Sequence, residues 1–209
     1  MNMQLCIPIK KIKDFTAAQK LADLTEIWFD EISGLSVTQL LKLKLQKLKP
    51  ILYKVTTSKN LELILKSKLI DFIDFDISTN DKVIRDFKLQ HPGIKLIISS
   101  HNFKSTPELP ILKKLAAKIL QKKADIIKIA TQSNSFKDSL KILKLLNDLT
   151  QDGHPAICLA MSKEGEFTRI AGQFLGNYLM YAPLNMADST APGQIPAKIL
   201  KKLIFQNVT

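Results

Sequence analysis

The segment Ala124-Asp125-Ile126-Ile127-Lys128-Ile129-Ala130 places one lysine inside a short apolar run. This composition is typical of a strand that is covered on both faces, where an isolated ammonium is costly to desolvate. A second apolar run, Leu96 to Phe103, ends close to His101, and a Gly/Pro-containing segment, Thr190 to Ile195, lies near the C-terminus. Polar groups suited to chemistry are therefore spread over three separate segments.

Strand-like and helix-like runs alternate along the whole chain, which is the pattern of βα units around a parallel sheet. The expected strands are Gln4 to Ile7, Thr25 to Phe29, Ile51 to Val55, Phe72 to Phe75, Lys95 to Ser99, Ile126 to Ile129, Ile157 to Ala160 and Tyr178 to Tyr181. The expected helices are Phe15 to Leu21, Val37 to Lys47, Asn60 to Ser67, Asp81 to Gln90, Pro107 to Gln121, Ser135 to Asp148, Thr168 to Leu175 and Pro196 to Phe205.

Eight βα units predict an α/β fold, a (β/α)8 TIM-type barrel. The 209 residues lie near the lower end of the ~200 to 400 residues that such barrels span, so the loops must be short. An open doubly wound sheet is the alternative. It fits less well, because no Gly-rich phosphate loop follows the first strand.

The composition predicts one domain, residues 1–209, because 45% of the residues are hydrophobic and no Gly/Ser/Pro-rich linker interrupts the chain. The first apolar run is interrupted by Lys10, Lys11 and Lys13, which is unlike a signal peptide, and no run approaches the ~18 residues of a membrane span. We therefore expect a cytoplasmic protein with no membrane partner. Cys6 and Cys158 lack metal-ligand spacing and are expected to be buried free thiols rather than a disulfide.

The formal net charge of +12 comes almost entirely from lysine, because Arg85 and Arg169 are the only arginines. Nucleic-acid sites favour clustered arginine with interleaved aromatic residues. A solvated lysine-rich surface is the interpretation that we favour over a nucleic-acid partner, and it gives a weak preference for anionic substrates.

The barrel prediction brings polar strand residues to one place. Side chains at the carboxyl ends of the strands converge on one mouth, so Glu26, Asp76, His101 and Lys128 are expected to meet there. The alternative for the two acids is a purely structural role, in internal ion pairs with Lys54 or Lys128.

Lysine chemistry has a natural form in such a mouth. Desolvation and nearby cations are expected to release a neutral amine from Lys128, which attacks a carbonyl and forms an iminium. His101, with an ordinary pKa of ~6.5, can then remove a proton from the adjacent carbon and return it to a leaving group. A hydrogen-bonded core histidine is the alternative. His91 and His154 lie in turn sequences, so no metal site is expected.

Four segments carry a specific resemblance: Ile97 to Pro107, Ala124 to Ala130, Met161 to Gly172 and Ala191 to Ile195. In these segments, and over nearly its whole length, the chain resembles the type I 3-dehydroquinate dehydratases of the shikimate pathway. The resemblance implies a (β/α)8 barrel, a homodimer, and no metal or organic cofactor. It also implies a lysine that forms a Schiff base with the ketone of 3-dehydroquinate, and a histidine that acts as base and then acid in a syn loss of water. Lys128 and His101 match these two positions.

The resemblance also assigns substrate contacts. Arg169 matches the arginine that holds the substrate carboxylate, and Gln194 matches the glutamine of a lid loop. Thr190 replaces a serine of that loop and keeps the hydroxyl. Glu26 matches the acidic residue of a Glu-x-Arg pattern.

Three positions depart from the family pattern. Trp28 stands where the arginine of the Glu-x-Arg pattern belongs. After the third strand, the family has an arginine followed four residues later by a glutamate and glycines, whereas this chain has Thr56-Thr57-Ser58-Lys59-Asn60. A ring-contacting arginine and the glutamate that orients the histidine are both absent.

Two residues are candidates to compensate. Lys54 lies two residues before Thr56 and points the same way in a strand, so it can supply the missing cation. Asp76 is the candidate to orient His101. Without compensation, the alternatives are a weakened enzyme, a Schiff-base lyase or aldolase acting on another keto acid, and a silenced barrel that binds a carboxylate ligand or a partner protein.

Overall fold

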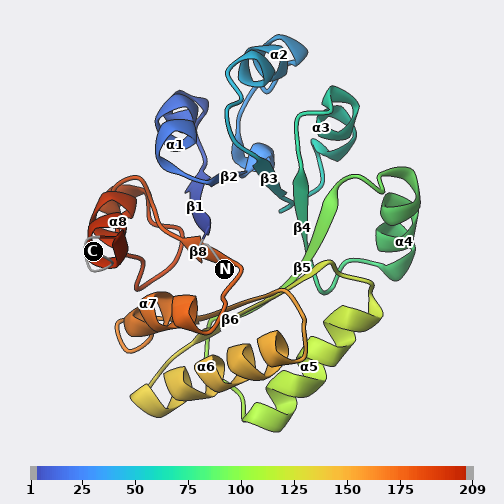
Figure 1. Ribbon diagram of the computed structural model, residues 1–209. Helices are drawn as coiled ribbons and strands as arrows, with labels where there is room; N and C mark the ends of the chain where they lie inside the picture. Colours follow the sequence, from blue (N-terminus) through green and yellow to red (C-terminus); the bar gives the residue numbers. More distant parts are fainter. Residues whose placement is uncertain (1–3, 206–209) are drawn as a thin grey trace.

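Parallel strands form the centre of the molecule, and helices surround them in a ring (Figure 1). The computed structural model describes residues 4–205, with side chains described as far as residue 203. The strands are β1 (Gln4–Ile9), β2 (Leu24–Ile27), β3 (Ile51–Lys54), β4 (Phe72–Asp76), β5 (Lys95–Asn102), β6 (Ile126–Gln132), β7 (Ala156–Met161) and β8 (Leu179–Tyr181). The helices are α1 (Phe15–Leu21), α2 (Val37–Leu45), α3 (Leu61–Ser67), α4 (Asp81–Gln90), α5 (Leu109–Gln121), α6 (Phe136–Gln151), α7 (Glu166–Phe174) and α8 (Ala197–Phe205). Short 3-10 helices lie at η1 (Ile12–Asp14), η2 (Phe29–Glu31) and η3 (Met186–Asp188).

The strands are bonded in the order β7-β6-β5-β4-β3-β2-β1-β8, and their ladders are parallel. In the part of the chain that the structure describes, no ladder joins β7 to β8. The buried Asn177 bridges them instead: its amide oxygen accepts from the Cys158 N–H at 3.0 Å, and its amide nitrogen donates to the Leu179 carbonyl at 2.9 Å. The result is a nearly closed (β/α)8 barrel, so the predicted fold class is confirmed.

Strand periodicity decides which side chains face the barrel interior. Along β6, Ile127 and Ile129 pack in the layer between the sheet and the helices. Ile126 and Ala130 belong to a second apolar cluster inside the barrel. Because alternate residues of a strand face the same side, Lys128 faces the interior as well.

Local sequence signals begin several helices. Ser36 and Gln39 form a capping box at α2, and the Ser135 hydroxyl accepts from the Asp138 N–H at the start of α6. Asn80 caps α4 in the same way, by accepting from the Lys82 N–H at 2.8 Å. These caps explain why the predicted helices begin within a few residues of the observed ones.

The predicted elements all exist, but some of their bounds differ. β5 and β6 continue beyond the predicted apolar runs to Asn102 and Gln132, because their polar ends pair with each other in register. The strand predicted through Phe29 ends earlier, since Phe29 begins η2. Cys6 and Cys158 are buried free thiols, as predicted.

Candidate active site

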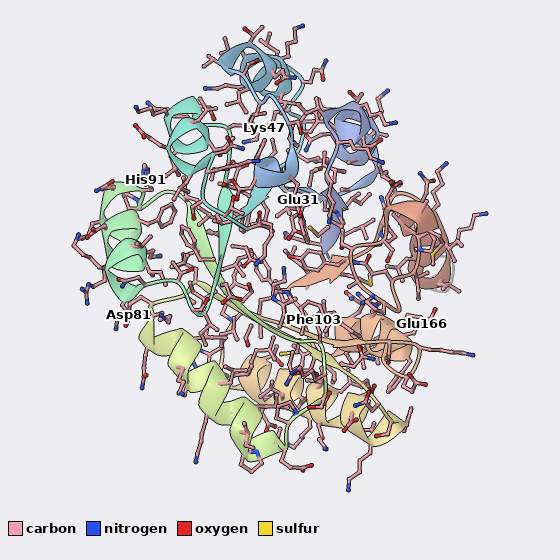
Figure 2. All side chains as sticks on the ribbon, turned by 180° about the vertical axis from the view of Figure 1, so that it is seen from behind. Glu31, Lys47, Asp81, His91, Phe103 and Glu166 are labelled. Carbon is pink, nitrogen blue, oxygen red and sulfur yellow. The ribbon has the colours of Figure 1, made fainter. Side chains whose placement is uncertain are left out.

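A cavity of about 490 Å³ opens at the carboxyl ends of the strands. All eight residues singled out from the sequence line it: Glu26, Lys54, Asp76, His101, Lys128, Arg169, Thr190 and Gln194. Apolar walls come from residues that include Ala130, Leu159 and Met161. Figure 2 shows Phe103, another lining residue, near the middle of the molecule, whereas Asp81 and His91 lie at the ends of α4, toward its edge.

Lys128 lies on the floor of this cavity and is only 5% exposed. Its ammonium donates to Asp74 Oδ2 at 2.8 Å and to the Tyr181 hydroxyl at 3.1 Å, and it lies 3.5 Å from Glu26 Oε2. The Tyr181 ring also faces the ammonium, with 4.3 Å between Nζ and the ring centroid. Such a set of acceptors satisfies a buried cation.

The expectation that burial releases a neutral amine from Lys128 is wrong. Burial alone lowers the pKa of Lys128, but the carboxylates of Asp74 and Glu26 outweigh burial and hold the pKa above its ordinary value. The resting lysine is therefore an ammonium. Before it can act as a nucleophile, it must give up a proton.

Lys54 lies beside this group. Its ammonium donates to Asp74 Oδ1 at 3.0 Å and to the Ser99 hydroxyl at 2.9 Å. The two lysines thus take one oxygen each of the same carboxylate. Burial raises the pKa of Asp74, but Lys128 and Lys54 together hold it well below its usual range.

His101 lies near the end of β5. In the β5–β6 register Ser99 pairs with Lys128, and His101 pairs with Ala130. The imidazole therefore stands two residues, about 7 Å along the strand, nearer the mouth than the lysine. The described residues offer no hydrogen bond to its ring, which stacks on Phe103 with centroids 6.0 Å apart.

The pKa of His101 is lowered to about 4. Burial is the main cause, and the cations Lys128 and Lys54 add to it, while Asp74 and Asp76 oppose them. The imidazole is therefore neutral at physiological pH and can accept a proton. This value lies well below the ordinary pKa on which the sequence argument rested.

Asp76 does not take the expected role. Its Oδ1 accepts from the Ser78 N–H at 2.9 Å and from the Ser78 hydroxyl at 2.6 Å. Within residues 4–205 it makes no hydrogen bond to His101, so it acts on the imidazole only through its charge.

Glu26, at the end of β2, is 2% exposed. Its Oε1 accepts from the indole N–H of Trp28 at 2.7 Å, and no described residue donates a hydrogen bond to Oε2. The alternative of an internal ion pair with Lys128 is present in the 3.5 Å contact. Glu26 therefore has one oxygen bonded to Trp28 and the other, screened from solvent, facing Lys128.

Arg169, on α7, is 1% exposed and sends its guanidinium to the wall of the cavity. Nη2 donates to the Pro192 carbonyl at 3.3 Å, whereas Nε and Nη1 have no partner within the described residues. Burial lowers the pKa of Arg169 to about 10, with Glu166 opposing the shift. A buried guanidinium with two free donor nitrogens is suited to a carboxylate.

The segment between η3 and α8 folds over the cavity. Gln194 is buried, and its Oε1 accepts from the Thr190 N–H at 2.9 Å while its amide donates to the Thr190 hydroxyl at 3.2 Å. Gly193 has a φ of +75°, and a Cβ there would lie 2.1 Å from the Ser162 carbonyl oxygen. The Ser162 N–H donates to Pro192 at 3.3 Å. Only glycine allows this segment to lie so close to Ser162.

The loop after β3 is built around an aspartate that sequence analysis missed. Asp30 is 4% exposed and accepts from the Tyr53 hydroxyl at 2.6 Å. It also accepts from backbone N–H groups of the loop, at Thr56, Thr57, Ser58 and Asn60. The Asn60 side chain donates to the Phe29 carbonyl at 2.8 Å. Thr56 lines the cavity, but Asn60 does not.

Asp74 and Tyr181 were also not singled out as site residues, although both contact Lys128. Asp74 lies inside an apolar strand, the same signal that pointed to Lys128, so it was detectable. Tyr181 ends an apolar strand and carries no such signal.

No three His, Cys, Asp or Glu side chains in residues 4–205 are grouped so that they could hold a metal ion. No helix in that range has the length and apolar character to cross a membrane.

The fold and the cavity define a class of protein: a (β/α)8 barrel with a buried lysine at the centre of its carboxyl-end cavity. The family profile of type I 3-dehydroquinases matches residues 8–207. The chain belongs to that family.

The proteins to which this chain is similar include several 3-dehydroquinate dehydratases. A 3-dehydroquinate dehydratase of Methanosarcina acetivorans is 34% identical over 64% of this chain, and the match spans 56% of that relative's own length. One of Methanococcus vannielii is 32% identical, with 96% of this chain and 98% of the relative covered. A crystal structure of the Geobacillus kaustophilus enzyme has a TM-score of 0.86 at 21% identity, covering 100% of this chain and 93% of that one, which shows the likeness of fold.

Proposed function

We propose that this chain converts 3-dehydroquinate to 3-dehydroshikimate through an imine on Lys128. One observation carries the proposal: a buried lysine, a neutral imidazole and a guanidinium with free donors line the same cavity. Membership of the type I 3-dehydroquinase family supports it further.

In the proposed reaction, Arg169, Lys128 and His101 each have a separate role. Arg169 binds the substrate carboxylate, and this sets the ketone over Lys128. The amine adds to the ketone carbon and water leaves, which gives an iminium. His101 takes a proton from the adjacent carbon, the electron pair forms an enamine, and the imidazolium returns the proton to the departing hydroxyl as water. Hydrolysis of the iminium then frees the product and Lys128.

Four further residues complete the proposed site. Glu26 accepts a hydrogen bond from a substrate hydroxyl. Lys54 supplies the positive charge that the family arginine would supply at the position of Thr56. Thr190 and Gln194 close over the bound ring. Asp76 supports the site only through its charge on His101.

The direct test is a dehydration assay on the purified chain with 3-dehydroquinate. Formation of the conjugated product, followed by its ultraviolet absorbance, is the expected result. Lack of product while 3-dehydroquinate still binds would replace this function by the silenced-barrel alternative. Turnover of another 3-keto acid only would keep the chemistry and change the substrate.

We also propose a cytoplasmic homodimer that uses neither nucleic acid nor a membrane as partner. Two buried free thiols suit a reducing compartment. Exposed aromatic residues on α6 and α7 support self-association: Phe136, 61% exposed, stacks on Phe167 at 4.7 Å, and Phe174 is 84% exposed. Sedimentation equilibrium decides between monomer and dimer.

A further inference from the structure

Trp28 holds one oxygen of the Glu26 carboxylate. The indole N–H donates to Oε1 at 2.7 Å. The other oxygen, Oε2, lies 3.5 Å from Lys128 Nζ and has no hydrogen-bond partner within residues 4–205. Because Glu26 is only 2% exposed, water does not compete for the bonded oxygen. The carboxylate thus has one oxygen fixed by the indole and one, screened from solvent, that faces the lysine.

Trp28 is held both at its backbone and at its ring. The backbone N–H of Trp28 donates to the Ile9 carbonyl at 3.1 Å, and its own carbonyl accepts from the Glu31 N–H at 3.0 Å. The ammonium of Lys10 lies 4.0 Å from the centroid of the indole ring and pairs with Glu31 at 3.1 Å. A cation over the ring face is attractive and limits rotation of the side chain.

A neutral donor has a different effect from a charged one at this place. An arginine, which the family pattern has there, would bond to Glu26 and also neutralise it. The indole supplies one directed N–H and no charge. The carboxylate of Glu26 is therefore left to act on Lys128.

We propose that Trp28 is a positioning residue: it turns the Glu26 carboxylate so that Oε2 faces the ammonium of Lys128, the group that forms the imine. The proposal rests on the proposed function and deepens it, because it makes a departure from the family pattern part of the working site.

The hydrogen bond itself can be tested without any activity. Trp28 is the only tryptophan of the sequence, so the protein gives a single indole N–H signal in a ¹⁵N–¹H spectrum. Glu26→Gln replaces a charged acceptor by a neutral one, and we expect the indole proton to move upfield and to exchange faster with solvent. Glu62→Gln makes the same chemical change on the exposed helix α3, in a residue that pairs with Lys66, and it should leave the signal in place. A signal unmoved by Glu26→Gln overturns the proposal, whatever the protein's activity.

The positioning role can be tested by a double-mutant cycle. Trp28→Phe keeps an aromatic ring and removes the donor, and we expect kcat/KM for 3-dehydroquinate to fall about 10- to 100-fold, the scale of a hydrogen bond to a charged group. In the Glu26→Gln background the same change should lower kcat/KM less than about twofold, because the residue acts through Glu26. Equal losses in both backgrounds would show a merely structural role.

Two controls keep the outcomes distinct. Thermal unfolding of Trp28→Phe shows whether it is folded; if it is not, the indole signal of Glu26→Gln decides. If wild-type protein does not dehydrate 3-dehydroquinate, the proposed function fails, and the cycle is measured on the dissociation constant of that compound. The indole test still decides whether Trp28 holds Glu26.

Discussion

Lys128 and Asp74 form a buried ion pair, with 2.8 Å between Nζ and Oδ2. This pair holds the lysine as an ammonium, yet Asp74 is a poor acceptor for its proton because its own pKa is held low. The imidazole of His101 lines the same cavity, but its pKa of about 4 makes it a weak acceptor as well. The amine is therefore freed only as it adds to the ketone, with the proton passing within the site.

The imine on Lys128 can be trapped. Borohydride added with 3-dehydroquinate should reduce the iminium and leave a covalent adduct on the peptide that contains Lys128, measured by mass spectrometry. Lys128→Met should give no adduct, while Lys54→Met should still be modified at Lys128. An adduct on Lys54 alone, or none under saturating substrate, contradicts the assignment.

His101→Ala should lower kcat by at least ~100-fold, the usual scale of general acid–base catalysis. Trapping by borohydride should still occur, though more slowly, because the iminium forms on Lys128. Single-turnover trapping beside steady-state kinetics separates the two steps. A variant with an unchanged rate would refute the role, and one that no longer folds would favour a core histidine.

The pH profile follows from the pKa of His101, about 4. The active resting form has neutral His101 and protonated Lys128, so kcat/KM should be level from about pH 5 through neutrality and fall as the pH drops through the pKa of His101. Internal transfer of the proton leaves the total charge unchanged, so no rise with pH is expected. A tenfold rise per pH unit would mean that the lysine loses its proton to solvent instead.

Lys54→Met tests how the second lysine acts. Removal of this cation should raise the pKa of His101, so the acid limb of kcat/KM should move to higher pH. A higher KM in the same variant would show that Lys54 also binds the substrate. Lys44→Met, a change on the outer helix α2, is the matched control and should alter neither. An acid limb that stays in place would exclude the electrostatic role.

Arg169→Lys keeps the charge and loses the planar fork. We expect binding of 3-dehydroquinate to weaken by roughly 1 to 3 kcal/mol, the range of a charge-assisted hydrogen bond. The dissociation constant is measured by isothermal titration calorimetry in a Lys128→Met background, because this background cannot turn over the substrate. Unchanged affinity would mean that another cation holds the carboxylate.

Gly193→Ala should raise KM roughly 5- to 10-fold, because the new Cβ would meet the Ser162 carbonyl and displace the segment that covers the cavity. Gly153→Ala is the matched control, since Gly153 also has a positive φ, +79°, but has nothing within 4 Å of the added atom. Both variants carry the same backbone strain, so only Gly193→Ala should change KM. Equal kinetic effects would remove the contact with Ser162 as the cause.

Sequence reasoning predicted the fold because each strand is a short apolar run between amphipathic helices, and the barrel follows from their number and order. It also predicted which residues share the cavity, because carboxyl ends of parallel strands meet. Hydrogen-bond partners were harder to predict. Asp76 bonds to Ser78, two residues away, in a local turn that the strand pattern does not predict. The position of Lys128 in its strand also does not predict its charge. That charge depends on the balance between burial and the carboxylates of Asp74 and Glu26.

Asp30 makes the loss of one family residue harder to reverse than the loss of another. Thr56→Arg would give up one weak hydroxyl contact to Asp30, at 3.3 Å, and keep the backbone bond. Asn60→Glu would remove the donor to the Phe29 carbonyl and bring a second carboxylate to the loop whose backbone surrounds Asp30. In evolutionary terms, the arginine can return by one substitution at position 56. The glutamate cannot return at position 60 unless the loop around Asp30 also changes.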